Sequence, residues 1–112
     1  MTLVEAVYRD TARFPAEEAF ALRARIRHAA LAVPSHLAEG ATRDTVGELL
    51  QFLGMSCGSL AALETQLEIA VRLGYLEPDA GAVIQTHRVG VLVTTLRQSL
   101  GNGLPKNNGG DE

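Results

Sequence analysis

The chain has 112 residues, the size of one domain that buries enough surface to fold without a metal ion or a disulfide. Aromatic residues make up 4% and tryptophan is absent, so the core must be aliphatic, which favours helices over strands. The net charge of −3 argues against a dedicated nucleic-acid binder, which usually carries an excess of basic residues.

Two helices are expected in the first forty residues. Thr2 and Glu5 form a capping box, in which each side chain satisfies a free amide of the first turn. This box predicts a short helix over about residues 3–13. Pro15 stands at a typical first helical position, so a second helix should follow directly. We expect that second helix to end at Gly40.

Pro34 lies inside the second predicted helix rather than at its end. Apolar residues recur at intervals of three and four on both sides of it without a change of phase. We therefore expect the helix to continue through Pro34 with a kink, although the lost backbone hydrogen bond costs about 3 kcal/mol. The inner stripe of this helix comprises Leu22, Ile26, Ala29, Val33, Leu37 and Gly40.

The third predicted helix is the longest. Thr45 and Glu48 repeat the capping box, and Gly74 is a typical left-handed C-cap behind Leu73. The inner stripe comprises Leu49, Phe52, Leu53, Leu60, Leu63, Leu67, Ala70 and Val71. Small residues interrupt this helix, so we expect a neighbouring helix, such as the one bent at Pro34, to approach it closely there. These small residues are Gly54, Ser56, Gly58 and Ser59.

A fourth helix completes the predicted fold. It opens at Pro78 and ends at Gly101, and its inner stripe comprises Val89, Val93, Leu96 and Leu100. One short and three long helices with brief connections predict an all-α, antiparallel up-and-down four-helix bundle over residues 1–101. Residues 102–112 have almost nothing to bury, so we expect a disordered C-terminal tail.

Two of the predicted helices carry a second apolar stripe that points away from the bundle core. On the second helix the stripe comprises Phe20, Ala24 and Leu31, and on the third it comprises Met55, Ala62, Ile69 and Leu73. Large apolar patches usually mark interfaces, so the chain is expected to form a homo-oligomer. The predicted oligomer interface uses Phe20, Leu31, Met55 and Ile69.

No pattern in the chain predicts an enzyme, a cofactor or a metal site. His36 and Glu39 form H-x-x-E, but a di-iron bundle needs two E-x-x-H motifs and two further glutamates. We expect a cation, either Arg43 or an arginine of an adjacent helix, to hold Glu39 beside the negative end of its helix dipole. The single Cys57, the absence of a leader and the short apolar runs predict a cytoplasmic protein with no membrane partner.

Basic residues in the first 43 positions suggest an alternative. Arg23 and Arg27 share a helix face, and Arg43 adds to the positive character of this region. Clustered in space, these three residues would contact the phosphates of a nucleic acid. The competing interpretation is that they pair with glutamates of this chain or of a neighbouring subunit, and the acidic balance of the chain favours it.

Several short motifs in the chain occur together in a combination that resembles that of a known protein family. They are Phe14-Pro15, Pro34-Ser35, Ala38-Glu39-Gly40 with Arg43, Gly58-Ser59-Leu60, Glu64-Thr65-Gln66-Leu67 and Gly74-Tyr75-Leu76. With these motifs the chain resembles the bacterial four-helix-bundle family of 23S rRNA intervening-sequence proteins, which includes the accessory variability proteins of diversity-generating retroelements. The resemblance covers about residues 7–100. It assigns Pro34, Ser35, Glu39, Gly40, Gly58 and Ser59 to the family motif.

The resemblance implies a homopentameric assembly of bundles. Retroelement accessories of this family are basic, pack against a reverse transcriptase and contact nucleic acid, whereas this chain is acidic. The chain also has His36 where the family usually has Asn, and Ala62 where it usually has Glu. The preferred hypothesis is a non-catalytic oligomeric scaffold or accessory protein whose partner is another protein or a ribonucleoprotein.

Two other functions complete the hypotheses. The first alternative is a nucleic-acid-binding accessory module that contacts phosphates through Arg23, Arg27 and Arg43 on an oligomeric ring. The second is an enzyme with a polar site near His36, Glu39 and Ser59, for which no recognisable catalytic arrangement exists.

Overall fold

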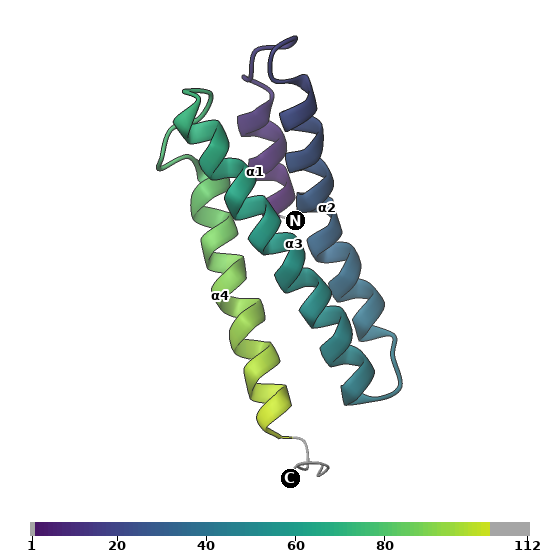
Figure 1. Ribbon diagram of the computed structural model, residues 1–112. Coiled ribbons are helices and arrows are strands. Elements are labelled where there is room, and N and C mark those ends of the chain that lie inside the picture. Colours follow the sequence, from purple (N-terminus) through teal and green to yellow (C-terminus); the bar gives the residue numbers. More distant parts are fainter. Residues whose placement is uncertain (1, 104–112) are drawn as a thin grey trace.

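A computed structural model describes residues 2–103 of the chain and shows four helices, without a strand among these residues (Figure 1). Successive helices run in opposite directions, so the predicted antiparallel bundle of one short and three long helices is confirmed. The last helix extends one residue past the predicted boundary, and residues 104–112 of the predicted tail lie outside the described residues. The helices are α1 (Thr2–Thr11), α2 (Phe20–Ala41), α3 (Val46–Arg72) and α4 (Gly81–Asn102).

The helices form a ring in which each one contacts its two neighbours. α2 packs on α3, α3 on α4, α4 on α1 and α1 on α2, whereas no Cα atoms of the diagonal pairs α1–α3 and α2–α4 lie within 8 Å of each other in the described part of the chain. α1 has 10 residues and α4 has 22, which correspond to about 15 Å and 33 Å of helix. Only one end of the bundle therefore contains all four helices.

The buried residues confirm the inner stripes predicted for α2 and α3. Ile26, Val33, Leu53, Leu63 and Leu67 are at most 2% exposed. One prediction for α4 was wrong, because Leu96 is 47% exposed. Leu96 lies in the half of α4 that the short helix α1 does not flank, so no fourth helix covers it. Buried residues that the stripes missed include Ser56, Ala82 and Thr86.

Two helices begin later than their prolines predicted. Pro15 starts one isolated turn, closed by a bond from Ala19 N to the Pro15 carbonyl oxygen at 3.1 Å, and α2 begins only after it, at Phe20. α4 begins at Gly81 rather than Pro78, because a residue of α1 sets this end. The buried Asp10 carboxylate accepts a hydrogen bond of 2.8 Å from Ala82 N and so caps α4 from another helix.

The other predicted helix ends are largely confirmed. Thr45 Oγ1 accepts a hydrogen bond from Glu48 N at 3.1 Å, as a capping box requires. Gly74 has φ +81°, and the following Tyr75 N donates to the Ala70 carbonyl at 2.9 Å, which closes α3 with a left-handed turn. Gly40 does not end α2, which continues to Ala41.

The two loops at the four-helix end of the bundle contact one another. The Phe14 and Tyr75 rings lie 5.6 Å apart, and the Tyr75 hydroxyl donates to Glu18 Oε1 at 3.1 Å. Desolvation, together with the neighbouring Glu18 carboxylate, raises the pKa of Tyr75 above its usual value. The α1–α2 loop is thereby attached to the turn that follows α3.

Pro34 lies within α2, as predicted, and α2 approaches α3 closely on either side of it. The buried Ser56 hydroxyl donates to the Val33 carbonyl oxygen at 3.0 Å. A Cβ atom on Gly40 would lie 2.9 Å from Phe52 Cβ, so only glycine fits there. The prediction was wrong for Gly58, because no atom of another element lies within 4 Å of its Cβ position.

α3 is unusually apolar for a helix with so much exposed surface. By length and by a mean hydropathy of 1.3, it is the one helix of the described chain that could cross a membrane, although the core helix of a water-soluble bundle meets the same test. Only 22% of this apolar window is buried within the structure. Much of the apolar surface of α3 is therefore left outside the core.

Candidate functional site

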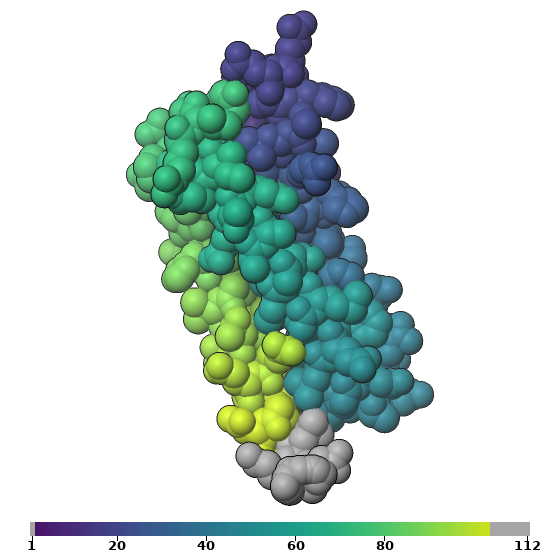
Figure 2. Space-filling model, viewed as in Figure 1, coloured from purple at the N-terminus to yellow at the C-terminus, as the bar shows by residue number. Residues whose placement is uncertain are grey.

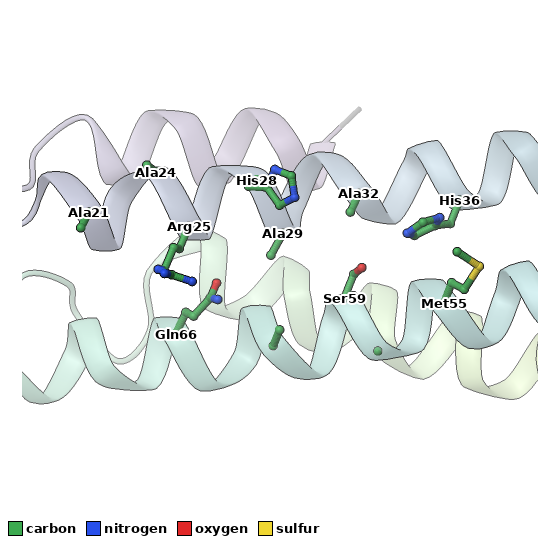
Figure 3. A pocket seen from close by; sticks show the side chains of 12 residues that line it. Ala21, Ala24, Arg25, His28, Ala29, Ala32, His36, Met55, Ser59 and Gln66 are labelled. Carbon is green, nitrogen blue, oxygen red and sulfur yellow. The ribbon is translucent and has the colours of Figure 1, made fainter.

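An open groove lies between α2 and α3, and we call it the α2–α3 groove (Figure 3). Its volume is about 950 Å³, and small side chains make up most of its floor. It lies on the outer side of both helices, although Ala29 of the inner stripe also lines it. Its lining comprises Ala21, Ala24, Arg25, His28, Ala29, Ala32, His36, Met55, Gly58, Ser59, Ala62 and Gln66.

Two polar atoms along this groove have no hydrogen-bond partner. His36 Nδ1 and Gln66 Oε1 are both buried and make no hydrogen bond among the described residues, although His36 Nδ1 lies 3.5 Å from Glu39 Oε1. Figure 3 shows Gln66 beside Arg25 towards one end of the groove and His36 beside Met55 towards the other. Buried polar groups normally find a partner, so these two atoms indicate that the groove is incomplete as an isolated surface.

The predicted partner of Glu39 was wrong. Among the described residues Glu39 pairs with no arginine; its partner is His36, whose Nδ1 lies 3.5 Å from Glu39 Oε1, and the Glu39 side chain is 54% exposed. Arg43 lies two residues past the end of α2, and its guanidinium carbon stands 4.7 Å from the centre of the Phe52 ring. Stacking on this ring directs Arg43 away from Glu39.

The three arginines of the nucleic-acid alternative do not gather in one place. Arg27 is bound to α1, because its Nε donates to Thr11 Oγ1 at 2.9 Å and its guanidinium stacks on Tyr8 at 4.4 Å. Arg23 lies near the start of α2, 5.8 Å from the Phe20 ring centre. Twenty residues separate Arg23 from Arg43, which corresponds to about 30 Å along a helix. Only Arg27 therefore has a defined role, as a contact between α1 and α2.

The second apolar stripes are exposed, as the sequence predicted. Phe20 is 63% exposed, Leu31 45%, Met55 48% and Ile69 43%. Ala24, Ala62 and Leu73 are also exposed, and the first two line the α2–α3 groove together with Met55. The predicted interface residues of α2 and α3 therefore lie in this groove or on the helices that form it.

A third apolar surface lies on α4 and was missed in the sequence. Its largest exposed members are Ile84, Val91 and Leu92, which are 40%, 53% and 69% exposed. Ile84 and Val91 are seven residues apart, almost opposite the buried Val93, so a search for a second stripe would have found them. We call this surface the outer face of α4.

No group of three His, Cys, Asp or Glu side chains that could hold a metal ion occurs between residues 2 and 103. A family model described as 23S rRNA-intervening sequence protein matches residues 1–91. The chain belongs to this family. No curated protein matches the chain.

The residues of the 23S rRNA-intervening sequence family motif serve two different purposes. The Ser35 hydroxyl bonds the Leu31 carbonyl at 2.8 Å in the turn that contains Pro34, and Gly40 lets α2 cross α3. Gly58 and Ser59 instead line the α2–α3 groove, and Glu39 follows His36 at one end of it. The motif therefore combines packing between α2 and α3 with an exposed groove.

Proposed function

We propose that this chain of the 23S rRNA-intervening sequence family is a non-catalytic, homo-oligomeric scaffold or accessory protein. The observation that supports the proposal is the exposed apolar surface on and beside the α2–α3 groove. Burying a large apolar side chain is worth about 1.5–3 kcal/mol, and each subunit offers several. Phe20, Leu31, Met55 and Ile69 would supply most of this free energy.

The proposed partner beyond the chain itself is another protein or a ribonucleoprotein in the cytoplasm. Association without catalysis agrees with the contents of the groove, where alanine, glycine and unpaired amide and imidazole groups line the walls. Such a wall fits a helix of a partner better than a reacting small molecule, because small side chains let another backbone approach closely. The relationship to retroelement accessory proteins belongs to the same proposal.

Light scattering coupled to size exclusion tests the oligomer. We expect the unmodified chain to exceed the 11.9 kDa of one copy, with the family resemblance predicting five copies. Changing Phe20→Asp and Leu31→Asp together should lower the mass while circular dichroism remains helical, because both residues lie outside the core. The matched control is Ala12→Asp with Ala16→Asp, which adds the same charge to exposed positions of the α1–α2 loop, outside the apolar stripes. A monomeric unmodified chain would contradict the proposal.

A titration with labelled DNA and RNA at two salt concentrations separates the scaffold from the nucleic-acid alternative. Phosphate contacts release counterions, so binding through arginines would weaken steeply as the salt concentration rises. We expect no such binding, because Arg27 is occupied by Tyr8 and Thr11 and Arg43 lies far from Arg23. Tight, salt-dependent binding that Arg23→Ala and Arg43→Ala remove would favour the alternative.

A further inference from the structure

We propose that the α2–α3 groove of one copy receives the outer face of α4 of the next copy, with both copies pointing in the same direction. This inference rests on the proposed homo-oligomer and adds which two surfaces meet. The contact is head-to-tail, because the groove and the outer face of α4 are different surfaces of the same chain.

The shapes of the two surfaces are complementary. The groove is a long hollow whose floor is formed by residues such as Ala24, Ala32, Gly58 and Ala62. The outer face of α4 is part of a single convex helix with exposed aliphatic side chains. Figure 2 shows α4 and α3 side by side on one face of the molecule, with α2 beyond α3. Met55 of the groove and Val91 of the outer face of α4 are both about half exposed.

Gly58 supports a close approach by a second chain. Glycine in the interior of a helix is unfavourable, and here no atom of another element of the same chain lies within 4 Å of its Cβ position. Gly58 lies near the middle of the 27 residues of α3 and on the wall of the groove. A helix of the next copy placed in the groove would use the space that Gly58 leaves open.

The unpaired polar atoms of the groove would also gain partners. Gln66 Oε1 needs a hydrogen-bond donor and is buried without one. With both copies pointing the same way, Gln66 would face the part of α4 that lies beside Glu64, where the exposed His87 imidazole carries a ring N–H donor. A purely aliphatic face would leave Gln66 unsatisfied, so the mixed composition of α4 suits this groove.

The charges at the two ends of the groove select α4 in one orientation. Arg25 lies beside Gln66 at one end of the groove, and Glu39 follows His36 at the other. Beside α4 the order of charge is reversed: Glu64 of α3 lies next to His87, and Arg97 lies next to Gly54. Copies that point the same way would bring Glu64 to Arg25 and Arg97 to Glu39.

A pairing of groove with groove explains less of the surface. It would leave Ile84, Val91 and Leu92 of α4 exposed in the assembly, whereas the head-to-tail contact covers both apolar surfaces at once. A head-to-tail contact repeats from copy to copy until it closes into a ring or continues as a filament. The assembly therefore has three or more copies.

The experiment blocks each surface separately and then mixes the two variants. Ala62→Arg places a bulky cation in the groove, and Val91→Arg places one on the outer face of α4. Both positions are exposed, so the fold should survive, as circular dichroism will check. We expect each variant alone to run as one copy. Mixed in equal amounts, they should form a species of two copies, because one intact groove and one intact α4 face remain.

Ala12→Arg is the control, since Ala12 is exposed in the α1–α2 loop, outside both the groove and the outer face of α4. It should keep the mass of the unmodified chain. If Ala62→Arg does not fold, Met55→Arg blocks the same groove from another exposed position.

The outcomes separate this inference from the proposed function. A monomeric unmodified chain would refute the homo-oligomer itself. An oligomer that survives Val91→Arg, a mixture that stays monomeric, or an unmodified chain of two copies would overturn the head-to-tail contact alone.

Discussion

The four-helix end of the bundle and the α2–α3 groove differ in how completely their polar groups are satisfied. At the four-helix end, Asp10 is buried yet bonds Ala82 N, and Arg27 binds both Thr11 and Tyr8. Along the groove, His36 Nδ1 and Gln66 Oε1 are buried with no bond. The buried polar groups of the first region have their partners, as in a protein interior. Those along the groove still lack them, as in an interface from which the second surface is absent.

This difference also separates two uses of small residues. Gly40 is small because α2 and α3 touch there, and a Cβ would lie 2.9 Å from Phe52 Cβ. Gly58 is also a glycine, but a Cβ atom at its position would meet no atom of another element within 4 Å. The contrast assigns Gly40 to packing within one chain and agrees with the contact between chains that we propose for Gly58.

The largest expected effect comes from removing the cap at the four-helix end. Asp10→Ala leaves the Ala82 amide without its partner, and loss of a buried bond to a charged group should cost about 2–3 kcal/mol of unfolding free energy. Urea denaturation followed by circular dichroism measures it. Asp79→Ala is the control, because Asp79 is exposed close to the same helix end. Equal effects of the two changes would contradict the capping role.

Gly40→Ala is the second largest expected change. The new methyl group would collide with Phe52 Cβ and with Leu49 Cδ1, 3.0 Å away, so overpacking should cost about 1–3 kcal/mol. Thermal unfolding of the variant checks this value. A melting temperature equal to or above that of the unmodified chain would show that α2 and α3 adjust at no cost.

Arg27→Ala should weaken the attachment of α1 to α2. It removes two hydrogen bonds and the stacking on Tyr8, which together are worth about 1–2 kcal/mol at this half-buried position. Arg88→Ala on the exposed surface of α4 is the control and should change stability by less than about 0.5 kcal/mol. An unchanged denaturation midpoint for Arg27→Ala would show that apolar contacts alone hold α1 in the bundle.

The smallest expected change in stability, that of Gly58→Ala, tests the contrast between Gly40 and Gly58 most closely. In the isolated subunit, Gly58→Ala should stabilise α3 and Gly90→Ala should stabilise α4, each by up to about 1 kcal/mol, because neither new methyl group meets another atom within 4 Å. Only Gly58→Ala should also weaken association. On dilution, the oligomer of this variant should dissociate at a higher protein concentration than the unmodified oligomer does. Equal association of both variants would remove Gly58 from the interface.

The sequence predicted the parts of the fold that depend on local chemistry. The inner stripes of α2 and α3, the passage of α2 through Pro34, the Thr45 cap and the turn at Gly74 follow from helical periodicity and from capping and turn chemistry. The start of α4 did not follow, because Asp10, more than seventy residues away in sequence, caps it.

The remaining errors have a similar origin in the packing of distant segments. Leu96 is exposed because α1 is too short to cover it. The apolar periodicity of α4 could not predict this exposure, because it carries no information about the length of α1. Arg43 stacks on Phe52 of the next helix instead of pairing with Glu39. Of the candidate site, the exposed stripes were predictable, whereas the groove between them depends on how α2 and α3 pack.

The mass of the unmodified chain in solution decides whether its exposed apolar surfaces form an interface between copies. Multi-angle light scattering at micromolar concentration should give a multiple of 11.9 kDa with three or more copies, because the apolar groove and the outer face of α4 need a neighbouring subunit to cover them. A mass of one copy across the concentration range would contradict the account.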